Sequence, residues 1–337
     1  SDGDGRAEQT QYFGDSDCGT GLAIDAQHLY YANDEEIWRM PLGPELLPNS
    51  PPERIAFALG KPAQHNARSL ALDGAGHVYV NIGAPSNACQ QQDRTPGSPG
   101  QDPCPLLSEF AGIWRFDINQ RDQRKTPALR YASGIRNAVA LDWHRDRLYL
   151  LQHGRDQLDT MFPDRFTAAQ NTELPAEEFV ALRQGEDLGW PYCYFDPAKS
   201  RKVLMPEYGG NGESVGRCGN FVTPLIGFPA HYAPNDLIFY SGNQFPAEYR
   251  DGAFIAFHGS WNRGGQQAGY HVVFVPFSGD KAGQWRVFAN GFAGTEPIRS
   301  SGQARYRPMG LAQLPDGSLL VVDSKTGRIW KISHQGR

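Results

Sequence analysis

Short runs in which apolar and polar residues alternate recur along the chain, and each run ends close to an aspartate and a turn. The clearest copies occupy residues 20–40, 67–83, 137–154 and 309–332, and a looser copy spans 236–292. Alternation with a period of two predicts strands with one buried face, and a DG or DR turn between two such runs predicts an antiparallel hairpin. The pattern therefore predicts a chain built of repeated strand meanders.

A meander of about four strands that recurs between long loops is typical of a β-propeller, in which blades stack around an axis. We expect an all-β fold with a single β-propeller domain over residues 1–337, made of four-stranded antiparallel blades. The blades are expected at residues 20–60, 65–133, 137–187, 222–293 and 305–334, the last of them one strand short.

The missing strand of that last blade has two candidate origins. Residues 7–13 (AEQTQYF), within the N-terminal segment 1–19, either close the ring as this strand or are the remnant of a further N-terminal blade. In the second case the first blade is incomplete in this chain. One helix is expected, over residues 172–185 (TELPAEEFVALRQG), with Pro175 in its first turn.

Composition agrees with this architecture and excludes several classes of protein. The 337 residues are 39% hydrophobic and 20% charged, with a formal net charge of -5. This mildly acidic balance argues against nucleic acid as a partner, because nucleic acid favours basic surfaces. We expect no membrane-spanning segment, since no apolar run approaches the ~18 residues that a spanning helix needs. The 38 glycines and 25 prolines favour short strands joined by turns.

The five cysteines include two pairs that enclose long loops. Cys89 and Cys104 bracket a loop rich in Pro, Gly and Gln, and Cys193 and Cys218 bracket a second loop. Two disulfides are the favoured interpretation, which would place the protein in the periplasm or outside the cell. The alternative is five unpaired thiols, and Cys18 has no evident partner. Zinc is disfavoured because no CxxC spacing occurs.

Polar residues stand at corresponding points of several predicted blades, where the loops of a propeller converge into a shared cup. They are His65, the pair Arg136 and Asn137, the loop residues Trp261, Asn262 and Arg263, and the pair Arg305 and Arg307. Any one of these alone is as readily explained by a solvated surface or a structural role. Together they predict a cup that holds an imidazole, an amide and several guanidinium groups. Arginine pairs with carboxylates in a bidentate geometry, so the expected ligand is a planar polycarboxylate.

The stretches HNARSLALDGAGHVYVNIG, SGIRNAVALD, GEDLGWPYCY, FHGSWNR and RYRPMGLAQLPDGSLLVVD resemble, in their order and spacing, the soluble pyrroloquinoline quinone (PQQ) sugar dehydrogenases. This family includes the glucose, sorbosone and aldose sugar dehydrogenase branches. The resemblance runs from about residue 20 to residue 332. It implies a six-bladed propeller with PQQ in the cup and a calcium ion on the cofactor.

The resemblance also implies roles for individual residues. His65 corresponds to the general base that takes the proton of the substrate hydroxyl. The cofactor-binding positions would be Arg136, which also lies near the reactive quinone carbonyl, Asn137, Asn262, Arg263, Arg305 and Arg307. The LGWP segment corresponds to the calcium site, with main-chain carbonyls of Gly189, Trp190 and Pro191 as ligands. Arg263 departs from the family, because the soluble glucose dehydrogenases place a lysine there.

These roles imply PQQ- and calcium-dependent oxidation of an aldose or a sorbosone-like sugar aldehyde, with hydride transfer to the quinone. The electron acceptor is not identified by the sequence. Two other functions stay open, a calcium-dependent lactonase-type hydrolase and a non-catalytic extracellular ligand-binding propeller. His153 and Asp156 are interpreted either as lining the substrate entrance or as a surface loop. Trp143 and Trp285 are expected to pack between blades.

Overall fold

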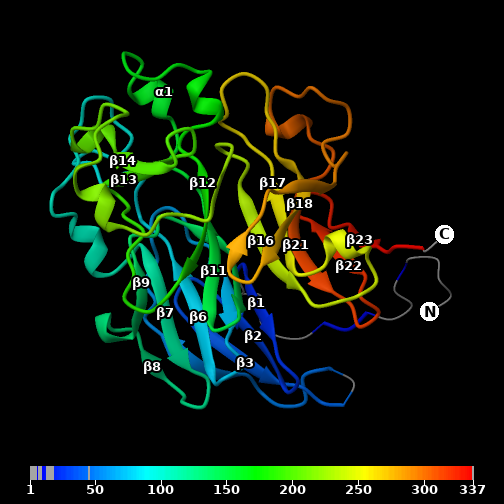
Figure 1. The fold of residues 1–337 in the computed structure, drawn as a ribbon. Helices are drawn as coiled ribbons and strands as arrows, with labels where there is room; N and C mark the ends of the chain where they lie inside the picture. Colours follow the sequence, from blue (N-terminus) through cyan, green and yellow to red (C-terminus); the bar gives the residue numbers. More distant parts are fainter. Residues whose placement is uncertain (1–5, 7–9, 13–18, 45, 336–337) are drawn as a thin grey trace.

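The computed structural model describes residues 6, 10–12, 19–44 and 46–335, and these residues form five antiparallel sheets in chain order around a central cavity (Figure 1). The first sheet holds β1 (Gly21–Ile24), β2 (His28–Ala32), β3 (Ile37–Pro41) and β4 (Glu53–Phe57), with β8 (Gln123–Arg124) parallel at its edge. The second holds β5 (Leu70–Leu72), β6 (His77–Ile82), β7 (Gly112–Asp117) and β9 (Arg130–Ser133). The third holds β10 (Ala138–His144), β11 (Arg147–Gln152), β12 (Glu177–Leu182) and β15 (Ile226–Phe228).

The fourth sheet is the one with the longest strands. It holds β16 (Pro234–Tyr240), β17 (Gly252–His258), β18 (Tyr270–Ser278), β19 (Lys281–Ala282) and β20 (Arg286–Ala289). The fifth has three strands, β21 (Pro308–Gln313), β22 (Leu319–Asp323) and β23 (Ile329–Ile332). A separate hairpin is formed by β13 (Cys193–Asp196) and β14 (Arg201–Leu204). The all-β propeller and the incomplete last blade that the sequence predicts are thus confirmed.

Helical structure in the described residues is limited to single turns. The α-helix α1 spans Leu158–Met161. The 3-10 turns are η1 (Pro105–Ser108), η2 (Pro127–Leu129), η3 (Gln170–Thr172), η4 (Pro206–Tyr208), η5 (Gly216–Asn220), η6 (Ala247–Tyr249) and η7 (Ser301–Gln303). No helix in this part of the chain has the length and apolar character of a membrane span.

The first strand of each sheet lies innermost, and these strands pack on one another in chain order from β1 to β21. They surround a central cavity of about 320 Å³, lined mainly by apolar side chains. Among the described residues the ring is open between β21 and β1, because these two strands do not pack together as the other neighbouring inner strands do. Leu22 of β1 and Ile329 of β23 line the cavity and are 66% and 60% exposed.

The blades are joined by apolar clusters that combine residues of neighbouring sheets, as the propeller architecture requires. Trp143 of β10 stacks on Tyr79 of β6, with ring centroids 4.9 Å apart, so it joins the second and third blades. Trp285 lies 5.5 Å from Phe228 of the third sheet. The prediction that both tryptophans pack between blades is therefore confirmed.

Two sequence-based expectations about elements are corrected. The helix expected over residues 172–185 is wrong, because residues 177–182 form β12, which pairs with both β11 and β15. Sheet pairing here overrides the helix propensity of Glu, Ala and Leu. The strand Ile226–Phe228 closes the third blade rather than the fourth. Cys18, and most of the predicted strand 7–13, lie outside the described residues, and residues 10–12 form no strand.

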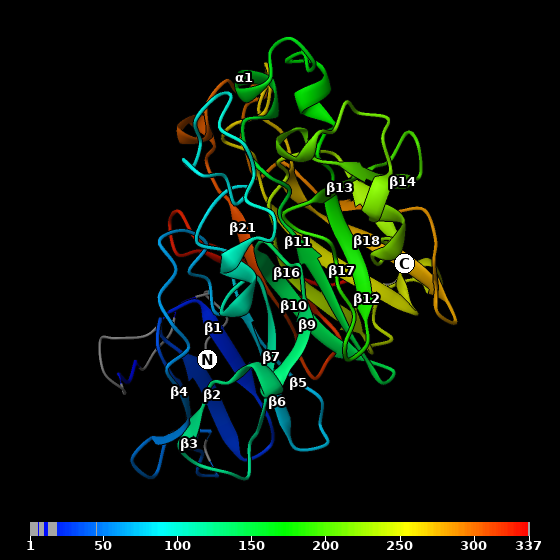
Figure 2. The ribbon, with the colours of Figure 1, turned by 90° about the vertical axis from the view of Figure 1, so that its left-hand side faces the viewer.

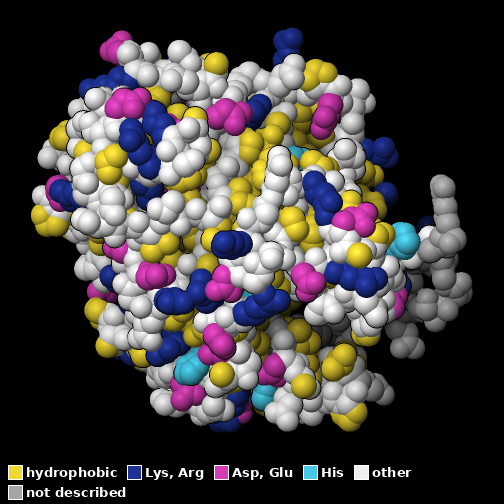
Figure 3. Space-filling model, in the orientation of Figure 1, with side chains coloured by type: hydrophobic (Ala, Val, Ile, Leu, Met, Phe, Trp, Pro, Cys, Tyr) yellow, Lys and Arg dark blue, Asp and Glu magenta, His cyan; other side chains and the backbone are white. Residues whose placement is uncertain are grey.

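The long connections gather at one end of the propeller. Figures 1 and 2 both show α1, the loop between β6 and β7, and the loop that precedes β21 at this same end. Figure 3 shows acidic and basic side chains interspersed over one face of the molecule rather than separated into fields of one sign. The arrangement confirms that loops distant in the sequence share one end of the fold.

Candidate active site

Residues from three consecutive blades line one cavity of about 320 Å³ among these loops. Its lining comprises Gln64, His65, Arg94, Arg136, Asn137, His153, Gly154, Asp156, Glu177, His231, Ala233, Trp261 and Asn262. The cavity therefore contains four of the predicted site residues, His65, Arg136, Asn137 and Asn262. They come from segments just before β5 and β10 and just after β17. We call this space the first cavity.

His65 is held by its ring and by its backbone. Its Nδ1 lies 2.7 Å from the carbonyl oxygen of Ala84, and since that oxygen can only accept, Nδ1 carries the proton and Nε2 is left as an acceptor. The residue has φ +55°, in the left-handed region. Gly83 allows this placement, because a Cβ there would lie 2.3 Å from the carbonyl oxygen of His65.

Left-handed backbone is concentrated around this cavity. Besides His65, the lining residues Arg94, His231 and Ala233 have φ values of +54°, +66° and +56°. The left-handed conformation costs a residue other than glycine on the order of 1 kcal/mol or more, and it is kept only where the surrounding structure enforces it. Strain of this kind is characteristic of functional sites, and its position here coincides with the cavity.

The three histidines of the first cavity are uncharged near neutral pH. Burial and the nearby charge of Arg136 hold the pKa of His65 well below its usual range. Burial lowers the pKa of His153 to about 4, and it likewise lowers the pKa of His231 to about 4. His153 uses Nε2 to contact the carbonyl oxygen of Pro234 at 3.0 Å. His231 uses Nε2 to contact Oδ1 of Asn171 at 3.1 Å. His65, which uses Nδ1 instead, is therefore the histidine of this cavity whose Nε2 makes no hydrogen bond within the described residues.

The carboxylate of Asp156 connects two arginines and an asparagine of the cavity. Its Oδ2 accepts hydrogen bonds from Nη2 of Arg94 at 2.8 Å and from Nη2 of Arg136 at 2.9 Å, while Oδ1 accepts from Nδ2 of Asn262 at 2.8 Å. Burial alone would raise the pKa of Asp156, but the charges of Arg136 and Arg94 lower it further than burial raises it. Of the two interpretations of Asp156, the structure favours a residue that lines a cavity over one of a surface loop, since its side chain is only 14% exposed.

Arg136 is fixed by a cage of acceptors. Its side chain is 3% exposed, and it donates to the main-chain oxygens of Asn87 and Gly154 and to Oδ1 of Asn87, in addition to Asp156. These four bonds use four of the five N–H groups of a guanidinium, leaving one on Nη1. The residue therefore presents a fixed positive charge and a single free donor.

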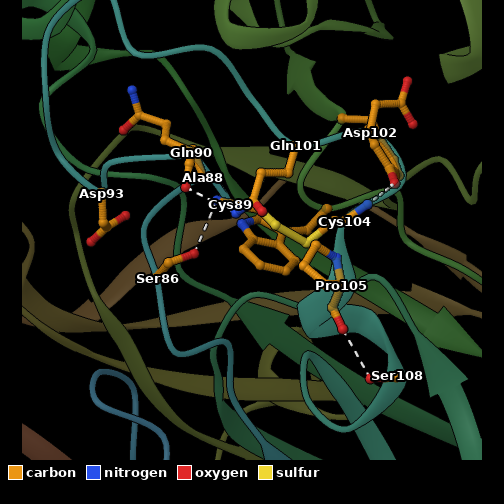
Figure 4. Close-up of a disulfide and its surroundings, with 12 residues drawn as sticks. Ser86, Ala88, Cys89, Gln90, Asp93, Gln101, Asp102, Cys104, Pro105 and Ser108 are labelled. Atoms are coloured by element: carbon orange, nitrogen blue, oxygen red, sulfur yellow. Dashed lines mark hydrogen bonds between the residues drawn. A yellow bond between two sulfur atoms is a disulfide. The ribbon is translucent and has the colours of Figure 1, made fainter.

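The disulfide Cys89–Cys104 (Figure 4) closes a loop that contains Arg94, a residue of the cavity lining. Asp93 of the loop accepts a hydrogen bond from Gln64, the neighbour of His65, at 2.6 Å, and Arg94 donates to the same glutamine. A second disulfide joins Cys193 and Cys218. Both predicted disulfides are thus confirmed, and the first restrains the loop that carries Arg94.

Glu177 was not recognised as a site residue from the sequence, yet it lines the first cavity. It is 1% exposed, and its two oxygens accept the main-chain N–H groups of Gly154 and Ala233. Burial raises its pKa to about 8, so the carboxyl is mostly protonated at neutral pH.

Among the described residues, the Oδ1 atoms of Asn137 and Asn262 are buried without a hydrogen-bond partner. Both amides belong to the cavity lining, so they are acceptors left for a ligand.

Three predicted arginines lie elsewhere. Arg263 lines a neighbouring cavity and pairs with Glu173 at 3.5 Å. Arg305 is exposed and lines a separate hollow beside Gly294. Arg307 donates to the main-chain oxygens of His258 and Gly259. The structure therefore does not bring these three guanidinium groups into the first cavity, and their cofactor role stays a prediction.

The predicted calcium segment lies outside the first cavity as well. The carbonyl oxygen of Gly189 already accepts the main-chain N–H groups of Tyr192 and Cys193 at 2.9 and 3.0 Å. Trp190 is 3% exposed, and its Nε1 donates to the main-chain oxygen of Asn87. Trp190 and Pro191 are not among the residues that line the cavity, and the metal role of this segment stays a prediction.

The fold and the first cavity define a β-propeller with a cationic, partly strained cup at its loop end. A family model described as TrAA12-like matches residues 4–335, and the chain belongs to this family. The resemblance to PQQ-dependent sugar dehydrogenases is confirmed at the level of family and fold.

Two curated relatives show how far the similarity extends. The chain is 28% identical over 269 residues to the pyrroloquinoline quinone-dependent pyranose dehydrogenase of Coprinopsis cinerea, covering 68% of this chain and 36% of that protein. It is 29% identical over 208 residues to an uncharacterized protein of Borreliella burgdorferi, covering 60% of this chain and 48% of that one. The chain thus spans about a third and about half of the length of these relatives.

Solved structures share the propeller fold. The holo PQQ domain of the Coprinopsis cinerea pyranose dehydrogenase superposes with a TM-score of 0.72 at 18% identity, covering 96% of this chain and 83% of that one. The calcium structure of the Trichoderma reesei AA12 protein gives 0.69 at 19% identity, covering 94% and 81%. The soluble aldose sugar dehydrogenase of Escherichia coli, in its apo form, gives 0.57 at 15% identity, covering 90% and 76%.

Proposed function

We propose that the protein is a quinoprotein that oxidises a sugar with PQQ bound in the first cavity. One observation carries the proposal: an imidazole with a free Nε2 and a caged guanidinium, those of His65 and Arg136, line the same cavity. Membership in the TrAA12-like family and similarity to a PQQ-dependent pyranose dehydrogenase support the same cofactor.

The residues of the cavity fit a planar polycarboxylate. Arg94 and Arg136 bring two positive charges, and Asp156 brings one negative charge. Glu177 adds little negative charge at neutral pH because its pKa is raised to about 8. The cavity is therefore cationic, and an anionic ligand is favoured there. The cofactor, when bound, supplies the hydride acceptor of the reaction.

The chain's own residues then perform the proton chemistry. Nε2 of His65 accepts the proton of the substrate hydroxyl, while the bond from Nδ1 to Ala84 keeps the ring in the required tautomer. Hydrogen bonds to Asp156 and Asn87 hold the charged guanidinium group of Arg136 in a fixed position. A bound anion raises the pKa of His65 toward neutrality, which makes the imidazole a stronger base in the loaded protein.

Calcium is part of the proposal. Calcium prefers oxygen ligands. The first cavity offers the unpartnered Oδ1 atoms of Asn137 and Asn262. We propose these two amide oxygens as candidate ligands beside the main-chain carbonyls predicted from the LGWP segment.

The proposed substrate is an aldose or a sugar aldehyde such as sorbosone, and the electrons pass to an external acceptor that the structure does not identify. We propose a periplasmic or secreted location. The two disulfides support it, since disulfides persist in oxidising compartments.

Reconstitution tests the proposal. The protein is loaded with PQQ and calcium, given an aldose and an artificial dye acceptor, and assayed for dye reduction. We expect the reaction to require PQQ, and His65→Gln to lower kcat by about 10²- to 10⁴-fold, the usual range for a general base. His77→Gln is the matched control, because His77 contacts Asp73 in a strand of the second sheet and does not line the cavity.

The same experiment distinguishes the alternatives. Opening of a lactone without PQQ would establish a hydrolase, and failure to bind PQQ would establish a binding propeller. The central cavity disfavours the calcium-dependent hydrolase, which would need polar ligands for its metal there. The lining of this cavity is mainly apolar, apart from Thr20, Ser69, Asn235 and Asp236. No group of three or more His, Cys, Asp or Glu residues suited to a metal occurs in the described part of the chain.

A further inference from the structure

A second cavity, of about 610 Å³, opens beside the first one at the outer strands of the fourth blade. The two cavities share a wall, because Tyr232 lines the second cavity while its neighbours His231 and Ala233 line the first. In the same way, the neighbouring residues Asn262 and Arg263 line the first and the second cavity, respectively. Apart from the predicted cofactor role of Arg263, none of the roles proposed above uses this space, whose volume lies within the roughly 300–1,000 Å³ of small-molecule sites.

Polar groups without partners line the second cavity. Within the described residues, the side chains of Gln266, Asn290 and Glu296 make no hydrogen bond or ion pair, and Nε2 of His271 and Nε of Arg263 are buried without a partner. Buried polar atoms are normally satisfied, so an unpaired imidazole nitrogen beside free amide and carboxylate tips marks a place where a hydroxylated ligand gains hydrogen bonds.

Aromatic rings lie next to these groups. Tyr232 packs edge-on against His271, with ring centroids 5.4 Å apart, and the guanidinium of Arg263 lies 5.8 Å from the ring centroid of Tyr232. Trp261, which lines the first cavity, is 59% exposed, an unusual state for the largest apolar side chain. Amphipathic rings beside planar polar side chains suit a ligand that is apolar on its faces and polar at its edges. A pyranose ring has this character.

We propose that the second cavity binds the sugar units that adjoin the oxidised aldose unit, so that an oligosaccharide is a better substrate than the free monosaccharide. The inference rests on the proposed sugar oxidation. The oxidised unit occupies the first cavity near His65, the chain passes Trp261 and the shared wall, and Asn290 and Glu296 contact the following units. Binding there adds affinity without touching the reacting atoms, so it lowers KM and leaves kcat unchanged.

The test uses the double variant Asn290→Ala with Glu296→Ala. Both residues are exposed, so the variant is expected to fold. The matched control is Asn220→Ala with Glu248→Ala, which removes the same exposed groups from surface positions outside both cavities. Steady-state kinetics of the PQQ-loaded protein are compared for glucose, cellotriose and maltotriose. We expect the double variant to raise KM for a trisaccharide about 5- to 10-fold, with its kcat and the kinetics on glucose unchanged.

A second readout does not depend on the cofactor. Calorimetric titration of the cofactor-free protein with the two trisaccharides and glucose is expected to show at least one trisaccharide binding more tightly than glucose, and the double variant losing that difference. If neither trisaccharide binds more tightly than glucose, or if the variant affects glucose and trisaccharide equally, the inference is overturned. If the loaded protein oxidises no sugar at all, the proposed function fails, while the titration still decides whether the second cavity binds oligosaccharides.

Discussion

Asp156→Asn removes the one negative charge that two arginines share. In the native protein its carboxylate accepts from Arg94, Arg136 and Asn262 at 2.8 to 2.9 Å. The substitution preserves shape but takes away the counter-charge of Arg136, which is 3% exposed and has no other acidic partner among the described residues. The main-chain oxygens of Asn87 and Gly154 continue to accept from the guanidinium, but they carry no formal charge.

The expected loss follows from this burial. Removing one partner of a buried ion pair costs about 3–5 kcal/mol, because the remaining charge is left uncompensated. The pKa of Asp156 is lowered in the folded protein, so its contribution is fully present above the unfolded value near 3.9 and is lost only as the pH falls through the lower folded value. The titration of Asp156 itself therefore adds no pH dependence between pH 5 and 8 to the difference in free energy of unfolding between Asp156→Asn and the native protein.

Urea unfolding at pH 7, followed by tryptophan fluorescence, gives the free energy of unfolding. Asp122→Asn is the control, because Asp122 is 60% exposed and pairs with Arg54 at the surface, where such a pair contributes about 1 kcal/mol or less. We expect Asp156→Asn to lose about 3 kcal/mol or more. A loss below about 1 kcal/mol, equal to that of the control, would refute the view that Asp156 organises the cavity.

Three further perturbations address the cavity. Replacing Cys89 and Cys104 by serine should lower the free energy of unfolding by about 3 kcal/mol, the loop-closure value for 15 residues, and should weaken PQQ binding at least tenfold. Serine at Cys193 and Cys218 should destabilise the protein similarly but leave the PQQ affinity unchanged, and equal PQQ affinities in both double variants would contradict the role given to the first loop. Because the pKa of Glu177 is raised to about 8, the stability that its carboxyl contributes falls as the pH rises from about 4.3 to 8, so Glu177→Gln should become more stable relative to the native protein over that range. Urea unfolding at pH 5.5, 6.5 and 7.5 measures this difference, and a difference that does not vary with pH would show that the carboxyl is charged throughout. Chelation with EDTA should abolish dye reduction and added calcium should restore it, while activity that survives exhaustive chelation would remove calcium from the account.

The propeller was predictable because its signal is repeated. Five copies of the same strand meander each report the fold, and an error in one copy does not change the conclusion. The errors fell where local and tertiary signals disagree. Residues 177–182 (EEFVAL) combine good helix formers with Phe179 and Val180, which favour strands, and the pairing of this segment with β11 and β15 makes it a strand. That error also hid Glu177, because it placed the residue on a helix rather than at the start of β12, where its side chain reaches the first cavity.

The site was predictable only in part. His65, Arg136 and Asn137 precede inner strands, so the repeat itself brings them to the same end. Arg94 carries no such signal, because it lies in a loop whose path is set by the Cys89–Cys104 disulfide and by contacts with Gln64. The LGWP segment was assigned to calcium by motif order alone, and order does not reveal that the carbonyl of Gly189 is already occupied by two N–H groups.

The most direct test of the account is a crystal structure of the protein loaded with PQQ. The account predicts the quinone in the first cavity, with Arg136 at hydrogen-bond distance and Nε2 of His65 facing the space for the substrate. A quinone bound elsewhere, with His65 and Arg136 unchanged and remote from it, would contradict the proposed function.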